Sequence, residues 1–344
     1  MGVHEAALLK MAGLHNCELV FAHFGNGLRE TPYCIMVDHN WECIVVSIRG
    51  TMSLDDCLTD LQAEPGSMEA VGIKWGFDGR GMYAHQGVLD RASWIRGDLE
   101  ERGHLRHLFS DKSGQLGEKS SDCPLSMRYG SYSLRVVGHS LGGSVAVLVA
   151  YMLRPMHPSV RCVAISPMGG VLSAPHAQGC SSFVLSVALS HDIVPRLSVR
   201  AVERVRDSVL DLLARSKVNK ITVMRSLVHG MDQDVNSYLY GGEEDVPETG
   251  FLAQLRRYRE WVEHQRATSP VPDLLTPGRI IHLVKTNTIK GWCGSKTSEY
   301  TPVWATPEDF ADIVVSRRMF VDHIITLSIP ALTDTLRSLV HNAG

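Results

Sequence analysis

The chain has 344 residues, of which 44% are hydrophobic and 21% are charged. This length is enough for one large α/β domain or two small ones, and the composition is typical of a folded protein. The formal net charge of −3 argues against a nucleic-acid-binding surface. The sequence holds no run of about 18 apolar residues, so it predicts no membrane-spanning helix.

The eight cysteines are scattered through apolar segments, which is typical of buried free thiols and not of a disulfide framework. The first residues lack the basic and apolar regions of a secretory signal. We therefore expect a cytoplasmic protein with reduced cysteines. The sixteen histidines form no known metal-binding motif, and no metal site is predicted.

Apolar strands alternate with helices along most of the chain. Strands 33–37 and 43–48 are expected to pair as a hairpin, and a helix is predicted over 53–61. The aromatic, glycine-rich segment 64–84 has no regular period. Helices are expected at 88–103 and 201–215, a strand, turn and helix at 134–153, and strands at 161–165, 183–189, 221–224 and 280–284. This alternation favours a mostly parallel sheet with helices on both faces.

The alternation is interrupted between residues 225 and 278. This stretch contains a glycine-rich acidic segment, a charged helix at 251–266 and several prolines. We interpret it as a partly mobile insertion within a single domain that spans residues 1–344. The last helix is expected at 328–341, with Pro330 in its first turn.

The most informative motif is Gly-x-Ser-x-Gly, formed by Gly138, Ser140 and Gly142 between a predicted strand and a predicted helix. In this context the motif predicts a nucleophile elbow, because the two glycines leave room in a sharp turn for the serine to project. A plain glycine-rich turn is the alternative. The amino end of the following helix would stabilise a negatively charged intermediate. Ser140 is therefore the predicted nucleophile of a hydrolase.

A serine nucleophile needs a histidine base and an acid that orients this base. In hydrolases with such an elbow the order along the chain is serine, acid, histidine. Asp192 follows the predicted strand 183–189, at the sheet edge expected for Ser140, and is the predicted acid; capping a helix is its alternative role.

The base is harder to identify. His323 lies between a late apolar segment and the last helix, where its side chain can reach the elbow. Spacing alone leaves five candidates open: His229, His264, His282, His323 and His341. We expect two backbone N–H groups to bind the oxyanion, from Leu141 after the nucleophile and from the turn at Gly50-Thr51, where the Thr51 hydroxyl adds a donor.

Several segments together resemble the class 3 lipases, and within these most nearly the sn-1-specific diacylglycerol lipases. They cover the chain from about residue 15 to 340. The segments are Ile48-Arg49-Gly50-Thr51-Met52-Ser53-Leu54, Leu58-Thr59-Asp60-Leu61, Ala84-His85-Gln86-Gly87, the elbow at 138–143, Ile165-Ser166-Pro167-Met168-Gly169-Gly170, Ser190-His191-Asp192-Ile193-Val194-Pro195-Arg196 and Trp304-Ala305-Thr306-Pro307-Glu308-Asp309-Phe310.

The resemblance implies an α/β-hydrolase fold with Ser140 as nucleophile, Asp192 as acid and Thr51 as oxyanion threonine. The segment 319–323 matches the catalytic-histidine region of the family and so implies His323 as the base. It further implies that 64–84 is a lid-like loop and that 225–278 corresponds to a regulatory insertion. Aromatic residues in 64–84 suit contact with lipid, although they would serve equally well as core residues.

The implied activity is hydrolysis of the sn-1 ester of diacylglycerol to a 2-monoacylglycerol and a fatty acid, through an acyl-enzyme and without metal or organic cofactor. Phospholipase A1 or triacylglycerol lipase activity is the alternative, and a lipid-binding module without turnover a remote one. The expected partner is a lipid substrate at a membrane or lipid-droplet surface; the sequence identifies no protein partner. The animal enzymes of the family carry four transmembrane helices before the lipase domain. This chain is therefore either part of an integral membrane protein or a homologue that meets membranes peripherally.

Overall fold

The computed structural model describes residues 16–25, 27, 30–50, 64–110, 129–219, 221–222, 237–268, 271–290 and 296–342. The chain divides into two compact units. The first comprises Met1–Val199 together with Asp273–Gly344, and the second is Arg200–Pro272.

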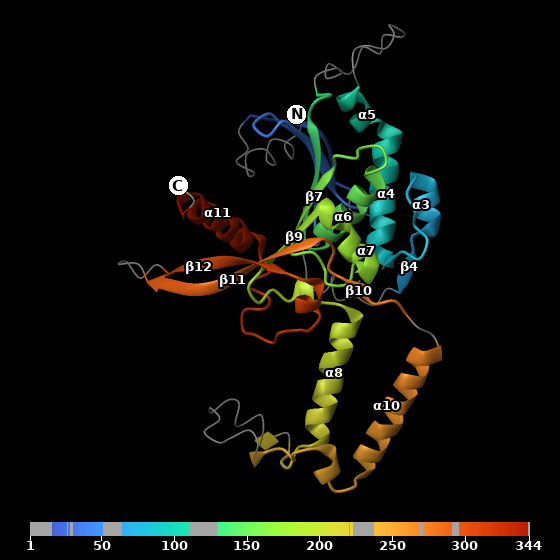
Figure 1. Cartoon of the computed structure of the whole chain (residues 1–344), viewed down its shortest axis with the longest axis vertical. Helices are drawn as coiled ribbons and strands as arrows, with labels where there is room; N and C mark the ends of the chain where they lie inside the picture. The colour runs from blue at the N-terminus through green and yellow to red at the C-terminus, as the bar shows by residue number, and fades with distance from the viewer. Residues whose placement is uncertain are drawn as a thin grey trace. The chain divides into compact units, whose positions relative to one another are not determined.

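An eight-stranded sheet forms the centre of the first unit (Figure 1). The strands in their order across the sheet are β1 (Cys17–His23), β2 (Tyr33–Asp38), β3 (Cys43–Ile48), β6 (Ser133–His139), β7 (Arg161–Ile165), β9 (Val184–Leu189), β11 (Arg279–Lys290) and β12 (Lys296–Ala305). Neighbours from β3 to β11 pair in parallel, whereas the pairs β1–β2, β2–β3 and β11–β12 are antiparallel. The expected mostly parallel sheet of the α/β-hydrolase fold is confirmed, as is the hairpin of β2 and β3.

Helices cover both faces of this sheet. On one face, α6 (Leu141–Leu153) lies between the sheet and α4 (Gln86–Arg102), and nearly all its residues are buried. A helix enclosed on all sides must be apolar all round, which explains its run of Val, Ala and Leu. On the other face, Ala331 of α11 (Ile325–Asn342) packs against Val187 and Leu189 of β9. Because side chains alternate along a strand, β9 contributes side chains to the packing on both faces of the sheet.

Residues 64–84 form regular elements and not the expected loop. They fold into β4 (Pro65–Ser67), α3 (Glu69–Trp75) and β5 (Tyr83–His85). With β8 (Leu172–Ser173) and β10 (Leu274–Leu275) the strands form a second, antiparallel sheet in the order β10-β8-β5-β4. Burial of Met68 and Met82 stabilises this arrangement, and Trp75 is partly buried against the same core. That the segment acts as a lid stays a prediction.

Short helices complete the first unit: α5 (His104–Phe109), α7 (Ala174–Gly179), η1 (Cys180–Ser182), η2 (Val194–Arg196) and η5 (Pro307–Phe310). The strand β12 was not expected from the sequence, and the helix expected at 53–61 lies outside the described residues. The last helix begins at Ile325, so Pro330 lies inside it and not in its first turn. The strand expected at 221–224 is wrong where it is described, because Ile221 and Thr222 are helical.

The second unit contains α8 (Val199–Ala214), η4 (Glu243–Asp245) and α10 (Gly250–Thr268). Ala214 packs with Leu252 and Leu255 of α10, and Arg266 forms an ion pair with Glu203 at 2.9 Å. The insertion expected at 225–278 therefore belongs to a unit that begins earlier and includes α8; residues 223–236 lie outside the described residues. Throughout the described ranges, every helix is too short or too polar to cross a bilayer.

Candidate active site

The elbow at Ser140 is a strained turn between β6 and α6. Ser140 adopts φ 58° and ψ −130°, a conformation that L residues rarely occupy. Its N–H donates to the carbonyl of Ile165 on β7 at 2.9 Å, and its carbonyl accepts the N–H of Ser144 at 3.1 Å. The turn is therefore held on one side by the sheet and on the other by the first turn of the helix.

Glycine is required at both flanks of the elbow because main-chain atoms meet there. A Cβ atom on Gly138 would lie 2.2 Å from the carbonyl oxygen of Gly142. A Cβ atom on Gly142 would lie 2.5 Å from the carbonyl oxygen of Ile48, at the end of β3. Similarly, a Cβ atom on Gly50 would lie 2.4 Å from the carbonyl oxygen of His139. The end of β3 thus lies directly against the elbow.

The structure brings Ser140, Asp192 and His323 together in one chain of hydrogen bonds. The Nε2 atom of His323 lies 2.9 Å from the Oγ atom of Ser140. Its Nδ1 atom lies 3.1 Å and 3.2 Å from the two carboxylate oxygens of Asp192. Ser140 and Asp192 are 2% and 1% exposed, and the side chain of His323 is 12% exposed. This is the geometry that a serine nucleophile, its base and an orienting acid require.

Asp192 has a local role as well. One of its carboxylate oxygens accepts the N–H of Val194 at 2.9 Å, in the manner of an Asx turn. The carboxylate of Asp192 therefore contacts His323 and also holds the following turn. The residue does not take the helix-cap position considered as its alternative role, because the N-cap of η2 is Ile193.

An ion pair with a buried carboxylate fixes the loop that carries His323. Asp322 is fully buried, and one of its carboxylate oxygens accepts hydrogen bonds from Arg318 at 2.9 Å and 2.6 Å. Its other oxygen accepts the backbone N–H of His191 at 3.2 Å, and the N–H of Ile193 donates to the carbonyl of Met319 at 3.1 Å. The loops on either side of the Asp192–His323 contact are thus joined. This ion pair was not among the features expected from the sequence, although opposite charges four residues apart beside a candidate histidine were a usable signal.

The ring of His139 lies against the ring of His323. The two centroids are 4.7 Å apart and the ring planes differ by 29°. The Nε2 atom of His139 is 2.9 Å from the main-chain carbonyl oxygen of His323. Burial, and next the neighbouring His323, lower the pKa of His139 to about 4, so its ring is neutral above that pH.

The other candidate histidines lie elsewhere. His282 of β11 bonds the carbonyl oxygen of Ser190 at 2.7 Å and meets the ring of Phe310 edge-on. His264 belongs to α10 in the second unit. His341 is part of α11, and His229 lies outside the described residues.

Leu141 occupies the position expected of an oxyanion donor, because it is the first residue of α6. The N–H groups of the first helical turn have no carbonyl partner within the helix. Thr51, the other expected donor, lies outside the described residues. Gly50 lies against the main chain of His139.

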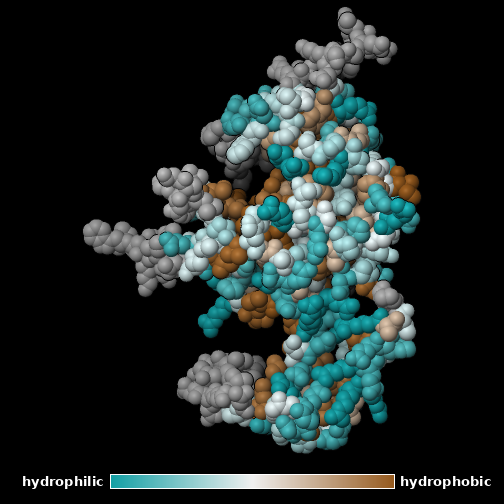
Figure 2. Space-filling view, viewed as in Figure 1, coloured by the Kyte–Doolittle hydropathy of each residue, from teal (hydrophilic) through white to brown (hydrophobic). Residues whose placement is uncertain are grey.

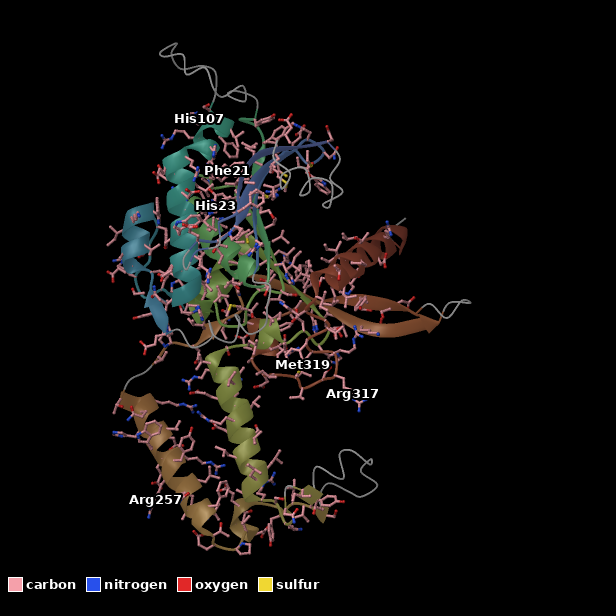
Figure 3. All side chains as sticks on the ribbon, turned by 180° about the vertical axis from the view of Figure 1, so that it is seen from behind. Phe21, His23, His107, Arg257, Arg317 and Met319 are labelled. Carbon is pink, nitrogen blue, oxygen red and sulfur yellow. The ribbon has the colours of Figure 1, made fainter. Side chains whose placement is uncertain are left out.

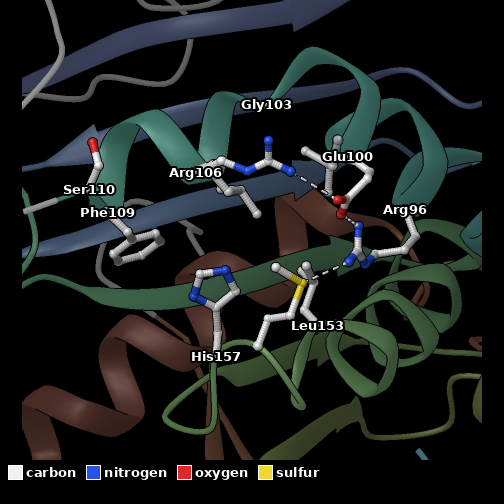
Figure 4. Close-up of a pocket in the computed structure, with 11 residues that line it drawn as sticks. Arg96, Glu100, Gly103, Arg106, Phe109, Ser110, Leu153 and His157 are labelled. Atoms are coloured by element: carbon white, nitrogen blue, oxygen red, sulfur yellow. Dashed lines mark hydrogen bonds and ion pairs between the residues drawn. The ribbon is translucent and has the colours of Figure 1, made fainter. Parts of the chain in front are cut away.

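A hollow of about 280 Å³ lies between α4, α5 and the carboxyl end of α6 (Figure 4). Arg96 crosses it, bonding Glu100 at 2.7 Å and the sulfur of Met156 at 3.1 Å. No residue of the Ser140 hydrogen-bonded chain lines this hollow. Ser140 precedes α6, whereas the hollow lies beyond its other end, about 20 Å away along a helix of 13 residues.

Comparison with known proteins relates the chain to lipases. Residues 45–202 match the family model described as lipase (class 3). Mouse diacylglycerol lipase-beta is 32% identical over 97% of this chain and 48% of its own length. Human diacylglycerol lipase-alpha is 30% identical over 95% of this chain and 29% of its own length. The chain therefore spans about half or less of the curated relatives that it matches.

Solved lipase structures also match. Lip2 lipase from Yarrowia lipolytica gives a TM-score of 0.44 at 19% identity, covering 56% of this chain and 65% of that chain. The triacylglyceride lipase of Rhizomucor miehei gives a TM-score of 0.40 at 21% identity, covering 54% and 62%. By the family match at residues 45–202 and the similarity to curated relatives, the chain is related to the class 3 lipases.

Proposed function

We propose that this chain is a serine lipase that hydrolyses the sn-1 ester of diacylglycerol, releasing a 2-monoacylglycerol and a fatty acid. The observation that carries the proposal is the continuous hydrogen-bonded chain from Asp192 through His323 to Ser140. The substrate class follows from relatives that are named diacylglycerol lipases. The position of the cleaved ester follows from the resemblance of the sequence to sn-1-specific enzymes.

In the first half of the reaction, His323 removes the proton of the Ser140 hydroxyl while the serine oxygen attacks the ester carbonyl carbon. Asp192 accepts the Nδ1–H of the histidine and stabilises the imidazolium that forms. The Leu141 N–H and Thr51 bind the negative oxygen of the tetrahedral intermediate. His323 then donates its proton to the departing glycerol oxygen, and an acyl-enzyme remains.

In the second half, water takes the place of the alcohol. His323 removes a proton from the water as it attacks the acyl carbon, and returns this proton to Ser140 when the fatty acid leaves. Each step uses one proton and one nucleophile, both supplied by these side chains and water. The mechanism needs neither a metal ion nor an organic cofactor.

We further propose that the loop before α11 meets the lipid surface of a membrane or lipid droplet. Its apolar side chains Val315, Phe320 and Ile324 are 77%, 48% and 49% exposed, and the last two are close to His323 in the sequence. Figure 2 shows that hydrophobic residues, in brown, reach the surface of the molecule. Arg317 points away from the ribbon (Figure 3) and forms no ion pair within the described part of the chain. Exposed apolar side chains beside a cation suit an interface with anionic headgroups.

The substrate assignment is tested by incubating the purified chain with 1-stearoyl-2-arachidonoylglycerol and identifying the products by mass spectrometry. We expect stearate and 2-arachidonoylglycerol, and no products from Ser140→Ala. Turnover by Ser140→Ala would refute the nucleophile assignment. If phospholipid or triacylglycerol is hydrolysed faster than diacylglycerol at equal interfacial area, that lipid is the substrate instead. A fluorophosphonate probe that fails to label Ser140 would instead support a lipid-binding module without turnover.

The lipid-facing surface is tested by flotation of Ser140→Ala protein with anionic vesicles. We expect an added Val315→Asp substitution to reduce the bound fraction by about ten-fold, because a charge at an apolar interface is costly. Ile73→Asp is the matched control, since Ile73 is 81% exposed but lies on α3. Val315→Asp on the active chain should still hydrolyse a water-soluble butyrate ester at the wild-type rate. If Ile73→Asp reduces the bound fraction more than Val315→Asp does, the lipid-facing surface lies in the 64–84 segment and not in the loop before α11.

A further inference from the structure

The side chain of His139 takes no part in the proposed reaction, yet it contacts the base that does. It makes two different contacts with His323. Its ring lies over the imidazole ring, with centroids 4.7 Å apart, and its Nε2 atom lies 2.9 Å from the His323 carbonyl oxygen. A carbonyl oxygen only accepts, so this hydrogen bond requires the proton of the neutral His139 ring to be on Nε2.

These contacts restrict two separate motions of His323. The hydrogen bond to the carbonyl fixes the main chain at residue 323, which follows a loop without regular structure. The ring contact limits rotation of the imidazole about its side-chain torsions. Both help to keep Nε2 in line with the Ser140 hydroxyl while Nδ1 faces Asp192, and the hydrogen bond contributes more because it fixes the main chain that carries the ring. An error of about 1 Å in a reacting group costs orders of magnitude in rate.

His139 is well placed for this task because the sheet holds it. It is the last residue of β6 and pairs with Ile165 of β7. It is also the direct neighbour of Ser140 in the sequence. The nucleophile and the support of its base are therefore fixed by the same strand end, although His323 is 184 residues further along the chain.

The charge of His139 matters because of what surrounds it. Asp192 is hydrogen-bonded to Nδ1 of His323, and Asp322 is paired with Arg318 next to the side chain of His191. Burial keeps the pKa of His139 at about 4, so the residue is neutral where His323 must be free to accept a proton. A neutral aromatic face does not repel the imidazolium that forms during the reaction, and it attracts a cation.

We propose that His139 is a positioning residue, which orients His323 toward Ser140 through its Nε2–H···O bond and its ring contact. The inference rests on the proposed function, since it assigns His323 the role of base. It predicts that a side chain at position 139 supports near-wild-type kcat only if it delivers an N–H group to the His323 carbonyl oxygen.

Three substitutions separate the hydrogen bond from the ring contact. In His139→Gln the amide nitrogen reaches the place of Nε2, whereas the shorter His139→Asn does not reach it, and His139→Phe keeps a ring without a donor. We expect kcat of His139→Gln to stay within about three-fold of wild type and kcat of the other two to fall about ten-fold, with KM changed less than two-fold; ten-fold is what one net hydrogen bond supplies. The rate of fluorophosphonate labelling of Ser140 should fall in parallel.

The matched control is His157→Phe. His157 is a partly buried histidine whose ring lies 4.8 Å from that of Phe109, and burial lowers its pKa too, but it lies beyond the far end of α6. We expect wild-type kcat from this variant. The acidic limb of kcat/KM should follow a single proton with an unchanged midpoint in every variant, because the ring replaced at position 139 was neutral.

Any of three results would overturn the proposal. These are an equal loss of kcat in His139→Gln and His139→Asn, a wild-type kcat in His139→Phe, and a pH-profile midpoint that shifts with the residue at position 139. If His139→Phe does not fold, as judged by circular dichroism, the comparison of the two amides decides the question. Failure of the proposed function looks different: wild-type protein then neither cleaves esters nor reacts with the fluorophosphonate.

Discussion

Arg318 and Asp322 allow a quantitative test of how the His323 loop is held. The two members of this ion pair differ in exposure: the Arg318 side chain is 42% exposed, whereas the Asp322 side chain is 1% exposed. Removal of Arg318 leaves a carboxylate that is buried without its cation. Removal of the charge on Asp322 leaves a cation that water can solvate. Arg318→Met should therefore destabilise the fold more than Asp322→Asn.

The magnitude follows from the contacts. Loss of one partner from a fully buried ion pair costs about 3–5 kcal/mol. Water reaches the arginine, and the His191 N–H still donates to Asp322, so we expect a free energy of unfolding lower by about 2–3 kcal/mol for Arg318→Met. For Asp322→Asn, whose amide oxygen still accepts hydrogen bonds, we expect about 1 kcal/mol.

The assay is urea unfolding followed by tryptophan fluorescence, with ester hydrolysis measured on the same samples. The double variant Arg318→Met/Asp322→Asn should be more stable than Arg318→Met alone, because it no longer contains an unpaired buried charge. The reasoning is refuted if Asp322→Asn lowers the free energy of unfolding more than Arg318→Met does. It is also refuted if the double variant is less stable than both single variants. Activity should fall with Arg318→Met even where the protein is fully folded, since the loop carries His323.

Three further predictions concern stability. Gly142→Ala should destabilise the fold by about 3 kcal/mol or more in urea unfolding and abolish hydrolysis, because its Cβ atom would lie 2.5 Å from the Ile48 carbonyl oxygen; near-wild-type values would contradict the elbow contact. Tyr33→Phe should cost about 1 kcal/mol, since it loses the 2.6 Å hydrogen bond to Asp98; an unchanged unfolding midpoint would contradict this. The pKa of His139, about 4 in the fold and about 6.5 unfolded, should make stability fall by up to about 3 kcal/mol as pH decreases between these values, and His139→Phe should flatten that part of the curve.

The sequence predicted those features that depend on short-range pattern. Ser140 and Asp192 both lie just after strands of the parallel sheet, as expected, because such a sheet brings all its carboxyl ends to one edge. The hairpin of β2 and β3 follows from apolar runs separated by turn residues. These local rules require no knowledge of what lies between the elements.

These local rules did not single out one of the five candidate histidines as the base. His323 is 131 residues after Asp192, and a second compact unit begins at Arg200 between them. Nothing in the sequence near His264 or His282 excludes them, and only the three-dimensional arrangement shows that His282 bonds the Ser190 carbonyl instead. The family resemblance, and not the spacing, implied His323 as the base.

Other misses have physical causes as well. In 64–84, only a few side chains such as Met68 and Met82 are buried in very short elements, which is too little to produce a period. The strand β12 lies at the sheet edge, where Val303 and Trp304 stay 47% and 59% exposed, so burial does not impose a clear alternation. Pro330 suggested a helix start, but the helix begins earlier and accommodates the proline within it.

The order of the strands has a consequence for synthesis of the chain. The elbow and Asp192 leave the ribosome well before β11, which closes the open side of β9, and before His323. The delay is 131 residues from acid to base, or roughly 7–26 s at translation rates of about 5–20 residues per second. Throughout this interval the nascent chain presents its serine without a proton acceptor. Under the proposed mechanism, lipids around the ribosome are therefore protected from hydrolysis until the sheet is complete.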